Sequence, residues 1–400
     1  MRCYHLLRQM ARFYEVHAIL FQKESELRTG DDDYRVPDSV CVYSPIDQPP
    51  PPSLFDRFPR RLRAGLQFRW MRRSWEGPAE GTLVRSHHLI RHVLTKICVD
   101  IVFFEHVQSM FAAPLVKRLS SKAVRILDAH NVDHDLMRQN IEDLPDKQRR
   151  GKQREIHRLR EIEHNLQRHV DAVFCCSATD RTKLARHNTI PIHVVPNGVD
   201  TTARSADSRP DKSSCRNILF CGNLKTLPNI NGIKWFGSAV WPRLCELNKE
   251  IKLIIVGGDG SRDDFSRLAN HPRVEFAGEV RDIVPYYYKA GIAICPLRQG
   301  SGTRLKILEA MALGNPVVST SIGAEGLDVE PGRNILIADD AETFAQSILK
   351  LLRTPETFNA IRRAGRDLAV SQYSWDVIGE RMAADMESTH GLTRKGHGLS

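Results

Sequence analysis

Residues 300–316, GSGTRLKILEAMALGNP, combine residue types that suit a negatively charged ligand. A glycine-rich turn runs into a short helical pattern that stops at Gly314. Free N–H groups and the positive dipole end of such a helix attract anions, and Arg304 and Lys306 add positive charge. Glu309, one turn further on, is better suited to accepting hydroxyl groups than to meeting phosphate. Phosphate and hydroxyl recognition in one segment indicates a nucleotide sugar as ligand.

Alternating short strands and helices must position this segment. Strand patterns lie at residues 217–221, 251–256, 274–276, 292–295, 316–319 and 335–337. Helical patterns lie at residues 230–236, 265–268, 283–289, 306–313 and 341–352. This alternation predicts a parallel sheet with helices on both faces. Ligands of such sheets bind beyond the carboxyl ends of the strands.

The first half of the chain shows a similar alternation. A helical pattern at residues 4–13 precedes a strand pattern at 16–20, and a long charged helix is expected over residues 143–170. Further strands are predicted at residues 101–104, 124–127 and 172–175, and at the start of 192–200. A doubly wound domain usually opens with a strand and a glycine turn, and neither precedes the first helix here. We expect the open reading frame to begin further upstream, the alternative being a degraded copy.

Four hundred residues predict two domains. We expect an N-terminal acceptor-side domain over residues 1–200 and a donor-binding domain over 201–374. The polar stretch 201–216 is the predicted linker. A last helix at 375–388 is expected to pack back on the first domain, and 389–400 to form a flexible tail.

The composition, 41% hydrophobic and 26% charged, is that of a soluble globular protein without a transmembrane run. Nine cysteines without CxxC spacing favour a reducing cytoplasm, with Cys175 and Cys176 in the core. The net charge is +10, and the first 200 residues carry 32 Lys and Arg against 25 Asp and Glu. With no nucleic-acid motif, an anionic membrane or acceptor is favoured over nucleic acid as partner.

Several ordered motifs together resemble a known family. They are VPNGVD at 195–200, GNLKTLPN at 222–229, IIVGGDG at 254–260, VEFAGEVRDIVPYY at 274–287 and SGTRLKILEAMALGNPVVST at 301–320. They resemble the family-4 retaining glycosyltransferases of the GT-B fold, in particular bacterial exopolysaccharide sugar transferases. The resemblance implies an α/β fold of two doubly wound Rossmann-like domains that face a cleft.

The resemblance also implies roles for individual residues. Glu309 matches the second glutamate of the family's E-x7-E motif, which bonds the donor ribose. The first glutamate is replaced by Ser301, so sugar recognition passes to Ser301 and to the backbone N–H groups of Gly302 and Thr303. Lys225 and Arg304, with Lys306, match positions that neutralise the diphosphate. Gly222 belongs to the nucleotide-binding turn. Val280 and Arg281 lie where the base packs. His130 matches the histidine near the reacting sugar carbon.

Competing explanations exist for other motifs. The acidic run 31–33 is better explained as a solvated loop than as a metal site. The spacings of His87, His88 and His92, and of His130 and His134, lack a third ligand. No metal and no cofactor besides the nucleotide sugar are therefore expected.

The sequence of residues 54–75 predicts a basic amphipathic helix. Phenylalanine, leucine and tryptophan recur at helical spacing among seven arginines. Such a helix can lie on an anionic membrane, or it can be a core-facing helix with a solvated basic side. This stretch motivates peripheral contact with the inner face of the plasma membrane.

The sequence thus predicts a cytoplasmic glycosyltransferase with a nucleoside-diphosphate sugar donor and a polysaccharide or lipid-linked acceptor. The alternative from another class is a catalytically inactive relative that binds nucleotide sugars or acts as a scaffold. A nucleotide-sugar epimerase is a third possibility, but the sequence shows no clear carboxylate pair with a histidine for it.

Overall fold

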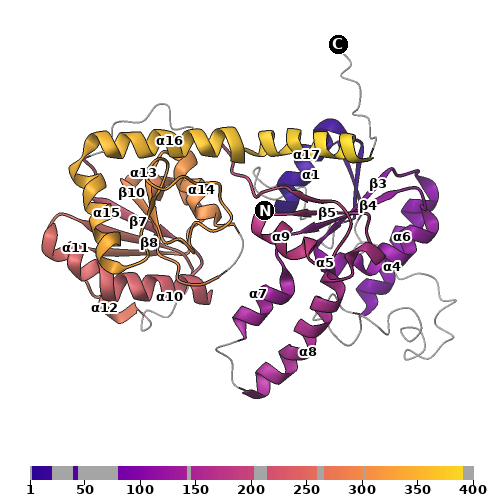
Figure 1. The fold of residues 1–400 in the computed structure, drawn as a ribbon, viewed down its shortest axis with the longest axis horizontal. Helices are drawn as coiled ribbons and strands as arrows, with labels where there is room; N and C mark the ends of the chain where they lie inside the picture. The colour runs from indigo at the N-terminus through magenta and orange to yellow at the C-terminus, as the bar shows by residue number, and fades with distance from the viewer. Residues whose placement is uncertain are drawn as a thin grey trace, which may run out of the picture. The chain divides into compact units, whose positions relative to one another are not determined.

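The computed structural model describes residues 2–19, 39–43, 80–141, 146–201, 214–258, 265–300 and 303–390. The chain forms two compact units. Unit 1 comprises Met1–Val195 and Gly379–Ser400, and unit 2 comprises Pro196–Ile378. Both units contain strands enclosed by helices (Figure 1). Within the part of the chain described, no helix has the length and apolar character needed to cross a bilayer.

Unit 2 is built on a six-stranded parallel sheet of order β12-β11-β10-β7-β8-β9. Its strands are β7 (Asn217–Cys221), β8 (Lys252–Val256), β9 (Val274–Gly278), β10 (Ile292–Cys295), β11 (Val317–Ser319) and β12 (Leu336–Ile337). Its helices are α10 (Leu227–Trp235), the π-helical turn η4 (Phe236–Val240), α11 (Trp241–Leu247), α12 (Ser266–Ala269), α13 (Val284–Lys289), α14 (Leu305–Ala312), α15 (Ala341–Arg353) and α16 (Pro355–Tyr373). Every strand predicted in this half is confirmed, with ends shifted by at most two residues.

The strands of unit 2 are apolar on both faces because helices cover both faces. In β7, Ile218 and Phe220 join one buried cluster while Leu219 joins the other. Strand β8 alternates in the same way, as side chains in a strand must. Helices α10 and α12 lie on one side of the sheet and α13 and α14 on the other (Figure 1). This burial holds the carboxyl ends of the strands in fixed places.

Unit 1 contains a four-stranded parallel sheet, β3-β4-β5-β6, and a parallel pair, β1-β2. The strands are β1 (Val16–Ile19), β2 (Val40–Tyr43), β3 (Ile101–Glu105), β4 (Val124–Ala129), β5 (Ala172–Cys175) and β6 (Ile192–Val194). The helices are α1 (Arg2–Phe13), α4 (Glu80–Lys96), α5 (His106–Ser109), η2 (Met110–Ala112), α6 (Ala113–Leu119), α7 (Asp133–Asn140), α8 (Asp146–Glu163), η3 (Leu166–Arg168) and α9 (Ala178–Ala185). Helix α17 (Trp375–His390) starts in unit 2 and continues in unit 1 from Gly379.

The prediction of a single long helix over residues 143–170 is wrong at the C-terminal end of that range. Helix α8 ends at Glu163, and the short helix η3 follows. The buried side chain of Asn188 stops α8, because its amide donates to the carbonyl oxygen of Glu163 at 2.7 Å. Its oxygen accepts the N–H of Leu166 at 2.8 Å. This tertiary cap comes from a residue far along the chain, so a local pattern could not reveal it.

Other predictions have different outcomes. Cys175 and Cys176 are buried as expected, and all nine cysteines are free. Strand β2 and helix α16 are among the elements that were not predicted. The membrane segment 54–75, the acidic run 31–33, and residues 202–213 and 391–400 lie outside the described residues.

The ends of β7 and β8 approach each other so closely that a side chain does not fit between them. A Cβ atom added to Gly257 would lie 1.9 Å from the carbonyl oxygen of Gly222. We therefore expect Gly257→Ala to lower the free energy of unfolding by about 3 kcal/mol or more. Chemical denaturation followed by circular dichroism measures this change.

Gly151→Ala is the matched control for Gly257→Ala. Gly151 lies in α8, and a Cβ atom there would meet nothing within 4 Å. Because alanine is the better helix former, this control should raise the free energy of unfolding by about 0.5–1 kcal/mol. Equal stability of the two variants would show that the strand ends are not packed as described.

Candidate functional site

The sheet of unit 2 has a topological switch point between β7 and β10. From β7 the chain moves to β8 and β9 on one side of the sheet, whereas β10 and its successors lie on the other side. Loops that leave neighbouring strands in opposite directions open a crevice at the carboxyl edge of the sheet, where ligands bind. Gly222 follows β7, and residues 296–304 follow β10.

The ammonium group of Lys306 lies at this switch point. Its Nζ donates a hydrogen bond to Oδ1 of Asn229 at 2.7 Å and lies 4.3 Å from the ring centroid of Phe220. A Cβ atom on Gly222 would come within 2.4 Å of the same Nζ. Burial lowers the pKa of Lys306, partly offset by the thiols of Cys295 and Cys221. Gly222 thus leaves room for a partly desolvated positive charge.

Arg304 brings a second positive charge to the same loop. It immediately precedes α14, and its Nη2 lies 2.8 Å from the position of a Cβ atom on Gly300. Burial lowers the pKa of Arg304, and its charge in turn contributes to the lowered pKa of Lys306. Two neighbouring cations repel each other, and a bound anion would offset that repulsion. The pair is therefore suited to binding an anion. The buried hydroxyl of Thr303 has no hydrogen-bond partner among the described residues.

Three other predicted residues lie along the carboxyl edge of the sheet. Lys225, in the turn after β7, is exposed and has its Nζ 3.9 Å from Oε2 of Glu279. Val280 and Arg281 follow β9, where Val280 packs against the core and Arg281 is exposed. In the sheet, β7 and β8 separate β9 from β10, so Val280 and Arg281 lie further from the loop after β10 than Lys225 does.

Helix α14 carries Glu309, which is half-buried one turn from its start. Ser301 and Gly302 lie outside the described residues. Asn229, in the first turn of α10, was not predicted as a site residue although it ends the quoted GNLKTLPN motif. A polar side chain at the start of a helix after a strand was the available signal.

His130 belongs to unit 1, where it follows β4. Its Nε2 lies 2.9 Å from Oε2 of Glu105 and 3.1 Å from Oδ2 of Asp128. The ring of His106 lies 3.7 Å from the ring of His130, centroid to centroid. His106 has a φ of 64°, an uncommon conformation for a residue other than glycine.

Arg2 completes the His130 cluster. Its Nε donates to Oδ2 of Asp128 at 2.8 Å and its Nη2 to Oδ1 at 2.6 Å. Burial disfavours the charged carboxylate of Asp128, but the charge of Arg2 and hydrogen bonds from His130 and Arg2 lower its pKa to about 2. Burial also disfavours charged His130, yet hydrogen bonds with Asp128, Cys3 and Glu105 raise its pKa to about 11. The cluster is a partly buried ion-pair network with the Arg2–Asp128 pair at its buried end.

Some of these atoms are close enough to hold a metal ion, because His130 forms triads with Cys3 and His106 and with Glu105 and Asp128 within 4.8 Å. The guanidinium of Arg2 already contacts both oxygens of Asp128. A cation would have to compete with that buried charge, so we assign no metal here.

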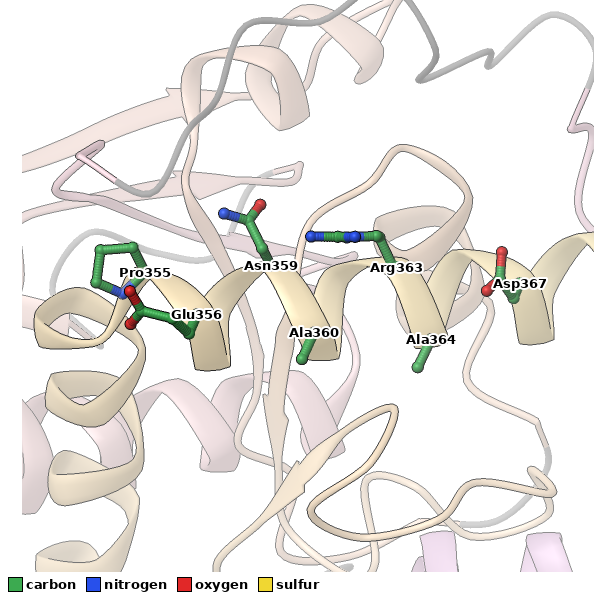
Figure 2. A pocket seen from close by; sticks show the side chains of 7 residues that line it. All are labelled: Pro355, Glu356, Asn359, Ala360, Arg363, Ala364 and Asp367. Carbon is green, nitrogen blue, oxygen red and sulfur yellow. The ribbon is translucent and has the colours of Figure 1, made fainter.

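A shallow groove follows α16, and the described residues that line it all belong to that helix, from Pro355 to Asp367 (Figure 2). Side chains of both charge signs alternate along it, with Glu356, Arg363 and Asp367 labelled in Figure 2. None of the predicted site residues that the structure describes lines this groove. The paired cations at the switch point are therefore the better candidate for an anion site.

Comparisons with known proteins match residues in both units of the chain. A family model described as Glycosyltransferase Family 4 matches residues 1–203. A second, described as Glycosyl transferases group 1, matches residues 215–354. The second model contains every predicted site residue of unit 2.

Two curated relatives match part of the chain. An uncharacterised 44.6 kDa protein in the cps region of Klebsiella pneumoniae is 33% identical over 146 residues, which make up 35% of this chain and 37% of that protein. A GDP-mannose-dependent monoacylated alpha-(1-6)-phosphatidylinositol monomannoside mannosyltransferase of Corynebacterium glutamicum is 27% identical over 214 residues, 48% of this chain and 55% of that protein. The chain thus spans about half or less of the length of these relatives.

A solved structure shares the fold over nearly the whole chain. It is that of Anabaena Alr3699/HepE in complex with UDP and glucose, with a TM-score of 0.65 and 14% sequence identity. The likeness covers 96% of this chain and 95% of that one. It confirms the predicted α/β fold of the GT-B type, with two Rossmann-like domains.

Proposed function

Because this chain belongs to glycosyltransferase family 4, we propose that it is a hexosyltransferase with a nucleoside-diphosphate sugar as donor. The transfer proceeds with retention to a polysaccharide or lipid-linked acceptor, in exopolysaccharide or envelope glycan synthesis. The observation that carries the proposal is the pairing of half-buried Arg304 and Lys306 at the switch point of a parallel sheet. Beside them, the missing side chain of Gly222 leaves the space in which the Lys306 ammonium group lies.

The chemistry of transfer explains why cations are needed there. Breaking the bond between sugar and diphosphate places negative charge on the leaving group. Fixed positive charges that are already partly desolvated stabilise it without reorganisation, and such electrostatic effects are often the largest in catalysis. Arg304, Lys306 and exposed Lys225 would supply this charge, so we propose that the reaction needs no metal ion. Chelation with EDTA should then leave the rate unchanged.

The nucleotide and the sugar are open to direct test. The mannosyltransferase relative is named as GDP-mannose-dependent, and the Anabaena structure contains UDP and glucose. A panel of GDP- and UDP-sugars should contain one that raises the melting temperature, because a ligand that binds only the native state stabilises it by mass action. The same donor should then be consumed in a transfer assay. Binding without turnover would favour an inactive, nucleotide-sugar-binding protein.

Glu309 is proposed to accept hydrogen bonds from the donor ribose. Loss of a hydrogen bond to a charged group costs roughly 1.5–3 kcal/mol, so Glu309→Gln should raise the donor KM about tenfold or more. A donor that lacks a ribose hydroxyl should bind the wild type about as weakly as the intact donor binds Glu309→Gln. In Glu309→Gln, the deoxyribose donor should bind no more weakly than the intact donor. Independent losses from the two changes would place the ribose elsewhere.

Contact with an anionic membrane through residues 54–75, at the inner face of the plasma membrane, is part of the proposal. Its support is the basic amphipathic pattern of that segment. Replacing four of its arginines should abolish co-sedimentation with anionic liposomes. Unchanged sedimentation would remove the membrane from the proposal.

A further inference from the structure

We propose that Arg2, Asp128 and Glu105 are positioning residues that hold His130 as a cation by its Nε2 atom and leave Nδ1 for a substrate oxygen. The role of His130 in transfer rests on the proposed function, whereas its charge and anchoring do not. The sequence indicated a catalytic role for His130 but none for Arg2, Asp128 or Glu105.

The anchor of the arrangement is the contact between Arg2 and Asp128. These residues are 126 positions apart, and they are 7% and 0% exposed. The two hydrogen bonds, at 2.8 and 2.6 Å, join both oxygens of the carboxylate to one guanidinium. Such a bidentate pair has a fixed geometry. It therefore sets the place of Asp128 Oδ2, the oxygen that His130 meets.

The contacts of His130 determine where its protons are. Nε2 lies within 3.1 Å of oxygens from Asp128 and Glu105, and carboxylates only accept hydrogen bonds. Nε2 must therefore carry a proton. Among the described residues, no partner is recorded for Nδ1 of His130. Of the two ring nitrogens, Nδ1 is consequently the one that remains for a substrate.

The charge balance of the cluster favours the imidazolium form. Two carboxylates, Asp128 and Glu105, face one guanidinium, and a second positive charge on His130 makes the cluster neutral. Burial and the charge of His130 lower the pKa of the adjacent His106 to about 4, so it does not compete for that proton. The titratable groups around His130 also include Cys3, Cys176 and Asp133. With the pKa of His130 raised to about 11, the ring is charged throughout the neutral range.

A cationic His130 is a hydrogen-bond donor and cannot act as a general base. With Nε2 occupied, Nδ1–H can donate to a hydroxyl or phosphate oxygen of the substrate. Removing one of the carboxylates should let the ring lose its proton near neutral pH. Activity that requires the charged ring would then fall as the pH rises through the lowered pKa.

The first experiment measures the charge of His130 directly. The full chain is labelled with 15N-histidine, and long-range 1H–15N spectra are recorded from about pH 6 to about pH 9. We expect His130 to remain doubly protonated over this range in the wild type. In Glu105→Gln, and in the double variant Arg2→Met with Asp128→Asn, it should titrate within the range. A neutral ring at neutral pH in the wild type would overturn the inference.

The choice of variants guards against misfolding. Glu105 has a side chain that is 35% exposed, so Glu105→Gln leaves the buried pair intact. The double variant removes both members of that pair together, because a lone buried charge is strongly destabilising. If the double variant does not fold, the titration of Glu105→Gln alone decides. Resonances of exposed His157 on α8 report whether the fold is preserved.

The second experiment measures transfer with the donor found in the panel. Glu105→Gln should lower kcat about tenfold at high pH, with little change in donor KM and recovery at low pH. His130→Asn, whose amide nitrogen replaces Nδ1, should retain more activity than His130→Gln, whose amide replaces Nε2. The reverse order, or a flat pH profile for Glu105→Gln, would contradict the inference. A charged His130 in a chain that transfers no sugar would refute the proposed function and leave the anchoring intact.

Discussion

Arg304→Ala should lower kcat/KM for the nucleotide sugar by about 100- to 1000-fold, the cost of removing one preorganised group that stabilises developing charge. Arg304 precedes α14 and is half-buried beside Gly300. Its positive charge is already partly desolvated, which lowers its pKa. Stabilisation of the leaving diphosphate would therefore be lost mainly in the transition state, and kcat should fall more than donor KM rises.

Two further variants sharpen this prediction. Arg304→Lys keeps the charge but loses the planar fork of donors, so its activity should lie between that of wild type and of alanine. Arg333→Ala is the control, because that side chain is 71% exposed and pairs with Glu330 three residues away. Wild-type activity in Arg304→Ala, or an equal loss in the control, would remove Arg304 from the site.

Lys306→Met should weaken binding of the nucleoside diphosphate by about 10- to 100-fold, as expected for a lost charged hydrogen bond. The same substitution should stabilise the unliganded protein by about 1 kcal/mol, a common trade between function and stability. The reason is that burial lowers the pKa of Lys306, so the charged form opposes folding. Methionine keeps the length of the side chain over Phe220 without that charge.

The pH dependence of stability gives this prediction a second signature. Because the pKa of Lys306 is lower in the folded state than in the unfolded state, the unfolded chain binds more protons. The stability of the wild type should therefore rise towards that of Lys306→Met as the pH increases. Denaturation at several pH values and calorimetric titration with nucleoside diphosphate measure both effects.

Lys289→Met is the matched control for Lys306→Met. Its Nζ pairs with Oε2 of Glu275 at 2.6 Å, and its side chain is half exposed. It should change binding by less than about twofold, since exposed ion pairs contribute little. If Lys306→Met destabilised the protein and bound nucleotide normally, Lys306 would be a structural lysine.

Local sequence patterns predicted most of the elements that carry the site. The bounds predicted for β5, β7 and β10 match the structure residue for residue. These strands are continuous apolar runs between polar turns, and such runs report burial on both faces of a sheet. The start of α14 was predictable from its glycine-rich approach, and with it the place of Arg304 and Lys306.

Contacts between distant segments were not predictable in this way. Asn229 meets Lys306 across 77 positions, and Arg2 meets Asp128 across 126. The end of α8 depends on Asn188, which lies beyond the next strand. Each contact depends on the order in which strands neighbour one another, and a residue pattern within one strand does not encode that order.

By itself the sequence therefore determined the class of fold, the strand ends that carry the site and the family that the chain resembles, because these follow from local periodicity and ordered motifs. Only the tertiary structure decided that β10 lies beside β7, which brings Lys306 to Gly222 and Asn229. It also placed His130 between two carboxylates, one of them held by Arg2. The physical reason is that the charge and proton positions of a buried group depend on neighbours supplied by other segments of the chain.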